Sequence, residues 1–309
     1  MKEFNPASYF ELDPNAILFS KLKEDNPDWW QKVKNEKRVY INIRKDGSIN
    51  VYCRGESIMK LEYTGESYVS TTNTYYLTDD EIKGKPQKFP PQVIVDRLEE
   101  IVDRMIRRKP SGKPEGDSEE GIKGQLFLSG GYIDTEFAYM RLARRKEIQA
   151  RLNKYQDNKD HRISKYAQDR IDLVKLENGA IQLVELKRIS DSRLNDHDSP
   201  VNGKSKAEIA EQISDYQFII DTYGDKMLAY YQNLQNVMRA LEINNDVVSQ
   251  RITRLSDYVE LYIAGYNDGK KFNPKRLNRI NTLKQLLEEN HIVHSNINEI
   301  LHNYLKLKD

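Results

Sequence analysis

Two acidic residues and a lysine in one short stretch of the chain have side chains that can bind a divalent cation and act on a phosphate group. Asp172 stands early in the segment IDLVKLENGAIQLVELK, and Glu185 and Lys187 stand at its end. Adjacent carboxylates repel one another, and partial burial deprives each of its hydration. A divalent cation offsets both costs, and Mg²⁺ prefers one or two carboxylates together with water and phosphate oxygens. The residue types therefore predict a cation site at Asp172 and Glu185.

A predicted β-hairpin would bring these side chains together. Residues 170–176 and 181–187 are rich in apolar and β-branched residues. Between them, Asn178-Gly179 is a strong hairpin signal, because both residues tolerate the positive φ that a two-residue turn needs. Pairing about this turn puts the first carboxylate opposite the second. The lysine lies two residues beyond the second carboxylate and therefore on the same face of the strand.

The sequence leaves the role of Lys187 open. Its pKa responds readily to burial, so the amine could deprotonate or position an attacking water. As an ammonium group it could instead stabilise the charge that grows on the phosphorus oxygens. A cation held by the carboxylates would polarise the phosphate and acidify the water.

This arrangement resembles the motif of the PD-(D/E)xK nuclease superfamily. Asp172 is followed, after twelve residues, by Glu185-Leu186-Lys187. Gln212 and Tyr216 resemble the Gln-xxx-Tyr motif of the RecB-type branch, and their spacing of four places them on one face of a predicted helix. Ile171 departs from the family pattern, because many members have a proline before the aspartate.

The resemblance implies a fold and an activity. The fold would be α/β (α+β), with a restriction-endonuclease-like mixed sheet flanked by helices, and a smaller antiparallel β domain would precede it. The activity would be hydrolysis of phosphodiester bonds that depends on Mg²⁺ or Mn²⁺, and we expect the nucleic acid to be DNA. Asp172 and Glu185 would hold the metal and Lys187 would serve the reaction, while Gln212 and Tyr216 would contact the substrate.

The family pattern also implies an acidic residue on the helix before the hairpin, as a further catalytic and metal-binding group. We place that helix at residues 132–152. Glu136 is the candidate on it, and Glu147 is the alternative. The resemblance covers about residues 130–225, so it gives no information on the first third of the chain.

Composition divides the chain into two parts. Residues 1–108 include an expected antiparallel meander at 38–78, which turns at Lys45-Asp46-Gly47, and end in a helix. Residues 109–124 are rich in Pro, Gly, Ser and charge, and we interpret them as a flexible linker. Residues 125–309 would then form the nuclease domain.

Helical spacing, caps and β-forming residues predict the remaining elements. They are a helix after Pro90-Pro91 with Ile94, Leu98, Ile101, Val102 and Met105 on one face, a β-prone stretch at Tyr75–Leu77, a helix at 205–222 opened by a capping box of Ser205 and Glu208, a helix at 226–243, a strand at Val259–Tyr266, a helix at 274–289 opened by Pro274, and a short helix at 295–307.

Composition limits the partners and the compartment. The net charge is only +1, so a nucleic-acid-binding face has to be a local patch. The basic cluster at residues 141–151 is either such a patch or a solvated helix face. No apolar run of about 18 residues is present, so we expect no membrane partner. Cys53 is the single cysteine and the N-terminus is too acidic for a signal peptide, which favours the cytoplasm.

Two other functions remain open at this level. One is a catalytically inactive nucleic-acid-binding module on the same fold. The other is a protein-interaction module, in which the tyrosine-rich sheet of residues 38–78 would be the contact surface. In either case, and also in a nuclease, the N-terminal part could recognise the target, bind a protein partner or form a homo-oligomer.

Overall fold

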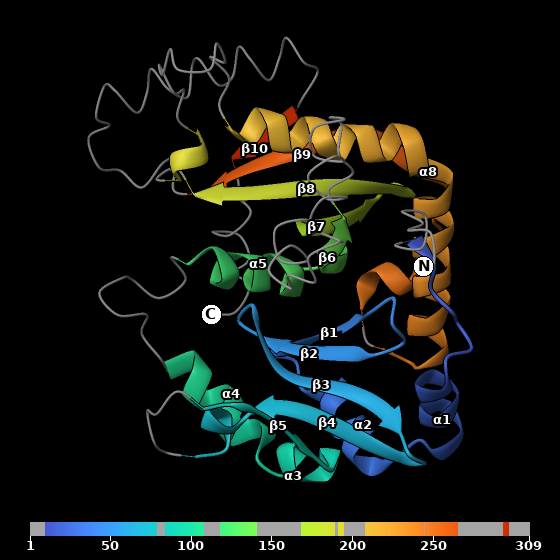
Figure 1. Ribbon diagram of the computed structural model, residues 1–309, viewed down its shortest axis with the longest axis vertical. Coiled ribbons are helices and arrows are strands. Elements are labelled where there is room, and N and C mark those ends of the chain that lie inside the picture. The colour runs from blue at the N-terminus through green and yellow to red at the C-terminus, as the bar shows by residue number, and fades with distance from the viewer. Residues whose placement is uncertain are drawn as a thin grey trace, which may run out of the picture.

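The chain forms two β-sheets, one after the other along the sequence, with helices packed on them. The computed structural model describes residues 10–78, 84–107, 118–140, 168–188, 191–194, 208–243, 245–264 and 293–296 (Figure 1). Its helices are α1 (Ile17–Asp25), α2 (Asp28–Asn35), α3 (Pro91–Val95), α4 (Leu98–Arg107), α5 (Glu119–Leu128) and α8 (Glu208–Ala240). Its strands are β1 (Val39–Ile43), β2 (Ile49–Cys53), β3 (Glu56–Thr64), β4 (Ser67–Asn73), β5 (Pro86–Phe89), β6 (Tyr132–Met140), β7 (Gln168–Glu177), β8 (Ala180–Arg188), β9 (Arg254–Ala264) and β10 (Val293–Asn296).

The first sheet is an antiparallel meander in which each of the strands β1 to β5 pairs with the next. The turn between β1 and β2 falls at Lys45-Asp46-Gly47, where Gly47 has a φ of +76°. The meander predicted for residues 38–78 is therefore confirmed. Its last stretch differs, because Thr74–Tyr76 forms a 3-10 turn in place of the strand predicted at Tyr75–Leu77. The side chain of Asn73 caps that turn by accepting a hydrogen bond from the backbone of Tyr75.

The helix predicted after Pro90-Pro91 is present as two shorter helices, α3 and α4. All five apolar residues predicted for its face are buried. The prediction was correct about the buried face and wrong about continuity, since residues 96–97 interrupt the helix.

The second sheet is mixed and has the strand order β10-β9-β8-β7-β6. Strands β6, β7 and β8 are antiparallel neighbours, whereas β8, β9 and β10 run parallel. Asn178 and Gly179, with φ of +50° and +77°, form the turn between β7 and β8. Leu173 pairs with Val184, which is the predicted register of the hairpin. A parallel neighbour requires a long crossover, and α8 lies in the connection from β8 to β9.

The helix predicted for residues 132–152 is wrong in its described part, because residues 132–140 form strand β6. Ile133, Phe137 and Tyr139 are buried and follow the period of two that is typical of a strand. The spacing of Phe137 and Met140 suggests a helical turn only when Ile133 and Tyr139 are ignored. Residues 141–152, including Glu147 and the basic cluster, lie outside the described residues.

Helix α5 begins inside the stretch predicted to be a linker. Ser118 caps it by accepting a hydrogen bond from the backbone of Gly121, and the segment from Gly121 to Gly124 is buried. A Cβ atom on Gly124 would lie 2.8 Å from the backbone nitrogen of Gly55, in the turn between β2 and β3. Glycine therefore serves here for close packing, and the linker prediction is wrong for residues 119–124. Residues 109–117 lie outside the described residues.

The two helices predicted at 205–222 and 226–243 are present in the described residues as the two parts of helix α8, which meet at a kink. Tyr223 interrupts the helix with a φ of −126° and a ψ of 15°, which marks the kink. The part before the kink lies along β8 and β9, and the part after it runs toward α1 and the first sheet (Figure 1). Ser205 of the predicted capping box lies outside the described residues.

The C-terminal predictions are confirmed only in part. Strand β9 confirms the strand predicted at Val259–Tyr266 as far as Ala264. Strand β10 overlaps the start of the helix predicted at 295–307 and contradicts it at residues 295–296. The helix predicted at 274–289 and the rest of the last one lie outside the described residues.

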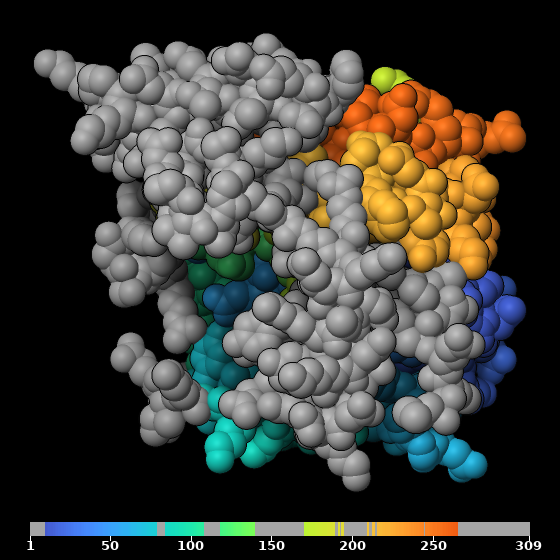
Figure 2. All heavy atoms as spheres, turned by 45° about the horizontal axis from the view of Figure 1, so that its top comes forward, coloured from blue at the N-terminus to red at the C-terminus, as the bar shows by residue number. Residues whose placement is uncertain are grey.

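Helix α5 and the edge of β6 join the two sheets. Tyr40 of β1 stacks on Phe127 of α5, with ring centroids 4.6 Å apart. The amide of Asn42 hydrogen-bonds the hydroxyl of Thr135 at 2.6 Å. In the space-filling view, the green atoms around α5 lie against the blue atoms of the first sheet (Figure 2). The helices in the described ranges include none with both the length and the apolar character needed to cross a membrane.

Candidate active site

The candidate site lies where strands β7 and β8 separate. Their pairing is regular up to Leu173 and Val184 and ends there, although both strands continue. Beyond this point β7 stays paired with β6. An oxygen of Asp172 instead accepts a hydrogen bond from the backbone N–H of Leu186 at 2.9 Å. The carboxylate thus takes the place of a backbone acceptor and lies directly against β8.

The two acidic residues and the lysine predicted from sequence converge here. The Nζ atom of Lys187 lies 3.5 Å from Asp172 Oδ2 and also forms an ion pair with Glu185 Oε1. It donates a third bond to the carbonyl of Leu186 at 2.8 Å. Asp172 is 7% exposed, and Glu185 and Lys187 are each 1% exposed. The predicted convergence of these side chains is therefore what the structure has.

Gln212 and Tyr216 of α8 hold Glu185 from the other side. Gln212 Nε2 donates to Glu185 Oε1 at 2.8 Å. The Tyr216 hydroxyl lies 2.8 Å from Glu185 Oε2 and 2.9 Å from the carbonyl of Arg170, and it accepts a bond from Gln212. Both residues predicted on the helix face therefore reach the site. Tyr216 is fully buried, so its contact is with the carboxylate and not with solvent.

Glu119 is a site residue that the sequence analysis missed. It is the first residue of α5, and its Oε1 atom lies 3.9 Å from Lys187 Nζ. A carboxylate of helix α5 therefore lies near Lys187, whereas Glu136, which we expected on a helix, lies on strand β6. The signal in the sequence was Ser118 followed by acidic residues and then Ile122 and Leu126, but the glycines among them suggested a linker.

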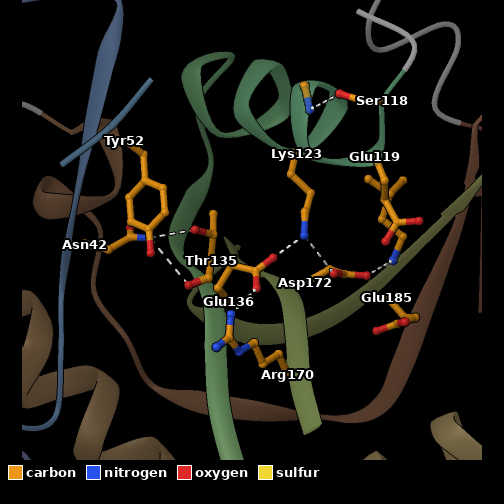
Figure 3. A network of polar contacts seen from close by, with 12 residues as sticks. Asn42, Tyr52, Ser118, Glu119, Lys123, Thr135, Glu136, Arg170, Asp172 and Glu185 are labelled. Atoms are coloured by element: carbon orange, nitrogen blue, oxygen red, sulfur yellow. Dashed lines mark hydrogen bonds and ion pairs between the residues drawn. The ribbon is translucent and has the colours of Figure 1, made fainter. Parts of the chain in front are cut away.

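Glu136 also reaches the site, but from strand β6 and through an ion pair. Its carboxylate contacts Lys123 of α5 and, at 3.3 Å, Arg170 of β7. Lys123 is the second residue that the sequence analysis missed, and its Nζ atom lies 3.2 Å from Asp172 Oδ1. Figure 3 shows Lys123 pointing from the helix toward both carboxylates. The prediction of Glu136 as a residue on a helix is wrong, because Tyr132–Met140 is a strand.

The buried ionisable groups of the site shift one another's pKa values. Burial, and then the charge of Asp172, raises the pKa of Glu185 to about 8. Burial opposes ionisation of Lys187, but Asp172, Glu185 and Glu119 outweigh this effect and raise its pKa. Lys187 is therefore firmly an ammonium group in this arrangement. Burial, together with Asp172, raises the pKa of Glu119 as well.

The donor set fits a hard divalent cation through two carboxylates. Within the described ranges, no three His, Cys, Asp or Glu side chains are grouped as a metal site. Asp172 and Glu185 nevertheless share Lys187 as a charge partner, which places an oxygen of each near the same point. Mg²⁺ accepts such a pair and fills its other positions with water and phosphate oxygens. Glu119 and Glu136, each 21% exposed at the side chain, lie on the more open side of the site.

A separate pocket of about 340 Å³ lies away from these residues. It is bounded by α2, β1, the C-terminal end of α5 and the segment around Asn245. Lys34 and Asp246 on its wall bind the Leu241 carbonyl and the Gly131 N–H, respectively. The pocket shares no residue with the candidate site.

Comparisons with known proteins identify no family for this chain. No protein-family model matches it, and no curated protein or solved structure does so either.

Proposed function

We propose that this protein is a metal-dependent nuclease of the PD-(D/E)xK type, with a restriction-endonuclease-like arrangement of its second sheet. The observation that carries the proposal is the meeting of Asp172, Glu185 and Lys187 at the point where β7 and β8 part. Two features of the family pattern support it further. The acidic residues lie on adjacent strands of a hairpin, and helices α5 and α8 both contact that hairpin.

The acidic residues and the lysine of the site have different proposed roles. Asp172 and Glu185 would hold Mg²⁺ or Mn²⁺, which when bound polarises a phosphate and lowers the pKa of a water. In the absence of a bound cation, the neighbouring carboxylates raise the pKa of Lys187 and favour its ammonium form. An ammonium group can orient the attacking water by hydrogen bonding and stabilise charge on the phosphorus oxygens.

Gln212 and Tyr216 act on the reaction through Glu185. Their bonds fix both oxygens of that carboxylate and so orient it toward Asp172. Supporting contacts of this kind tune the affinity of a metal site. Gln212 is only partly buried and is the one of the pair that we propose also contacts the nucleic acid, which we take to be DNA.

The test is a cleavage assay on circular and linear DNA and RNA with Mg²⁺, Mn²⁺ or EDTA. The variants are Asp172→Asn, Glu185→Gln and Lys187→Met, each close in size to the native side chain. We expect each to lower metal-dependent cleavage by at least about a hundredfold. Glu177→Gln is the matched control, because Glu177 lies on the same hairpin and is exposed at its far end.

Circular dichroism and melting temperature would verify that each variant is folded. Cleavage that survives all three substitutions, or that persists in EDTA, would discard the proposal. If the native protein neither cleaves nucleic acid nor binds Mn²⁺, the catalytically inactive module would be favoured. That outcome has a physical basis in the structure, because Lys123 and Lys187 already compensate the carboxylates.

A further inference from the structure

Lys123 neutralises a carboxylate that a bound cation would use as a ligand. It lies on α5 one helical turn after Glu119, and its side chain is 7% exposed. Its Nζ atom is 3.2 Å from Asp172 Oδ1, on the opposite side of that carboxylate from Lys187. Asp172 therefore lies between two ammonium groups.

The electrostatic consequence for Asp172 is direct. Its Oδ2 atom already receives the Leu186 N–H and Lys187, so Oδ1 is the atom that Lys123 neutralises. Two positive charges a few ångströms apart in a buried place repel strongly, because little water screens them. A divalent cation that takes Asp172 as a ligand therefore competes with the amine of Lys123.

Glu136 offers that amine a second partner already in contact with it. Thr135 pairs with Leu173 and Phe137 pairs with Ile171, so Glu136 lies opposite Asp172 in the register of β6 and β7. Its φ is +55°, which is a strained conformation for a residue with a Cβ atom inside a strand. Such strain is often found at functional sites, where the surrounding structure enforces it. In this protein the strained residue is Glu136, and its carboxylate forms an ion pair with Lys123.

We propose that Lys123 is an internal counter-ion of Asp172, which a divalent cation displaces, and that Glu136 retains the displaced amine. Lys123 and Glu136 are then positioning residues for cation binding, and Glu136 is not itself a ligand. This inference rests on the cation site of the proposed function. It identifies the amine of Lys123 as a competitor for that site.

The two residues predict opposite effects on cation affinity. Lys123→Met keeps an unbranched side chain but removes the competing charge, so the affinity for Mn²⁺ should rise at least about tenfold. Glu136→Gln removes the alternative partner and leaves the amine on Asp172, so the affinity should fall several-fold. The double variant should bind Mn²⁺ as tightly as Lys123→Met, because Glu136 acts only through the amine.

The experiment is titration calorimetry of the full chain with MnCl₂, at one fixed pH. Lys123→Arg, which keeps the charge, should retain the native affinity. Lys175→Met is the matched control, since Lys175 forms an ion pair with Glu177 at the distant end of β7. Melting temperatures recorded alongside separate a loss of folding from a change in binding. Glu136→Gln, on a partly exposed side chain, keeps the test usable if Lys123→Met fails to fold.

Several outcomes would overturn the inference. Unchanged Mn²⁺ affinity in Lys123→Met would do so, as would a melting temperature that falls with no change in affinity. A double variant that binds much more weakly than Lys123→Met would make Glu136 a ligand. Cleavage by the native protein alongside unchanged affinities would sink this inference and leave the proposed function standing. The predicted order of affinities without any cleavage would do the reverse, and no Mn²⁺ binding in any protein would remove both.

Discussion

Glu185 is a carboxyl group that the fold buries next to another carboxyl group. Lys187, Gln212 and Tyr216 all bind it, yet its pKa is raised because burial and Asp172 together oppose its charge. Without a divalent cation, protonation is one way to relieve this opposition. The residue is therefore sensitive to pH in a range where an ordinary glutamate is fully ionised.

This raised pKa predicts a pH-dependent stability in EDTA. A carboxyl whose pKa is higher in the folded protein than in the unfolded chain stabilises the fold at low pH, and this contribution is lost as pH rises through about 8. The native protein should thus lose up to about 1.4 kcal/mol per pH unit on this account between roughly pH 5 and 8. Glu185→Gln should lack that part of the slope.

Urea unfolding at intervals of pH measures the difference. Asp134 has its own pKa raised to about 6 by burial, and it contributes a slope of the same sign in both proteins. Only the difference between native and variant is therefore diagnostic. Parallel curves for the two proteins between pH 5 and 8 would contradict the assignment.

Two buried tyrosines, Tyr216 and Tyr231, differ in the hydrogen bonds of their hydroxyl groups. The Tyr216 hydroxyl bonds Glu185, Gln212 and the Arg170 carbonyl, whereas no hydrogen-bond partner of the Tyr231 hydroxyl is found among the described residues. Tyr216→Phe should lower the free energy of unfolding by about 1–3 kcal/mol, because it leaves buried polar groups unsatisfied. Tyr231→Phe should be neutral or stabilising. Urea midpoints of both variants test this, and equal losses would contradict it.

At the scale of elements, α5 shows how glycine can serve packing. A Cβ atom on Gly124 would meet backbone atoms of residues 54 and 55 at 2.8–3.1 Å, and backbone cannot move aside as a side chain can. Gly124→Ala should therefore destabilise the protein by about 1–3 kcal/mol. It should also disturb the site, because the same helix carries Glu119 and Lys123.

Gly224 in α8 is the matched control for this prediction. A Cβ atom there would meet only Leu255 Cδ2, at the ordinary distance of 3.5 Å. Gly224→Ala should be neutral or stabilise by up to about 1 kcal/mol, since alanine favours helix over glycine. Thermal or urea unfolding of the two variants compares them directly. A larger loss for Gly224→Ala would show that the close approach of α5 is not the limiting contact.

The elements also show what the sequence could predict. The hairpin of β7 and β8 was predictable because Asn178-Gly179 and the period of two are both local signals. The convergence at Asp172 followed from the register. Strand β6 and helix α5 were mispredicted because their signals depend on distant partners. Gly124 of α5 packs on a turn more than sixty residues earlier, which no local pattern in the sequence reveals.

At the scale of the whole molecule, a buried ion pair links the two sheets. Arg44, just after β1, lies 3.1 Å from Asp134 of β6, and Asp134 is 1% exposed. The guanidinium of Arg44 also donates a hydrogen bond to the carbonyl of Thr135 at 2.8 Å. The first sheet is thus held to the edge of the second by charged and polar contacts as well as by the aromatic contact with α5.

Removing one partner of this ion pair should destabilise both sheets together. Arg44→Met leaves the Asp134 carboxylate buried without its cation, which typically costs about 3–5 kcal/mol. Lys60→Met, in an ion pair of half-exposed side chains, should cost less than about 1 kcal/mol. Tryptophan fluorescence reports on Trp29 and Trp30 in α2, and circular dichroism reports on the whole chain. Both signals should shift together for Arg44→Met, and separate transitions would contradict a shared buried contact.

The position of α5 between the sheets has a consequence for transplanting the chemistry. A fragment starting at Ser118 would keep all four acidic residues and both lysines of the site, but its first helix would lose the turn at Gly55 and the ring of Tyr40 that support it. The part of that helix that contacts the first sheet would then face water. Lys123 and Glu119 would then lose the support that fixes their position, so we expect residues from Ser118 onward to need the first sheet in order to keep the candidate site intact.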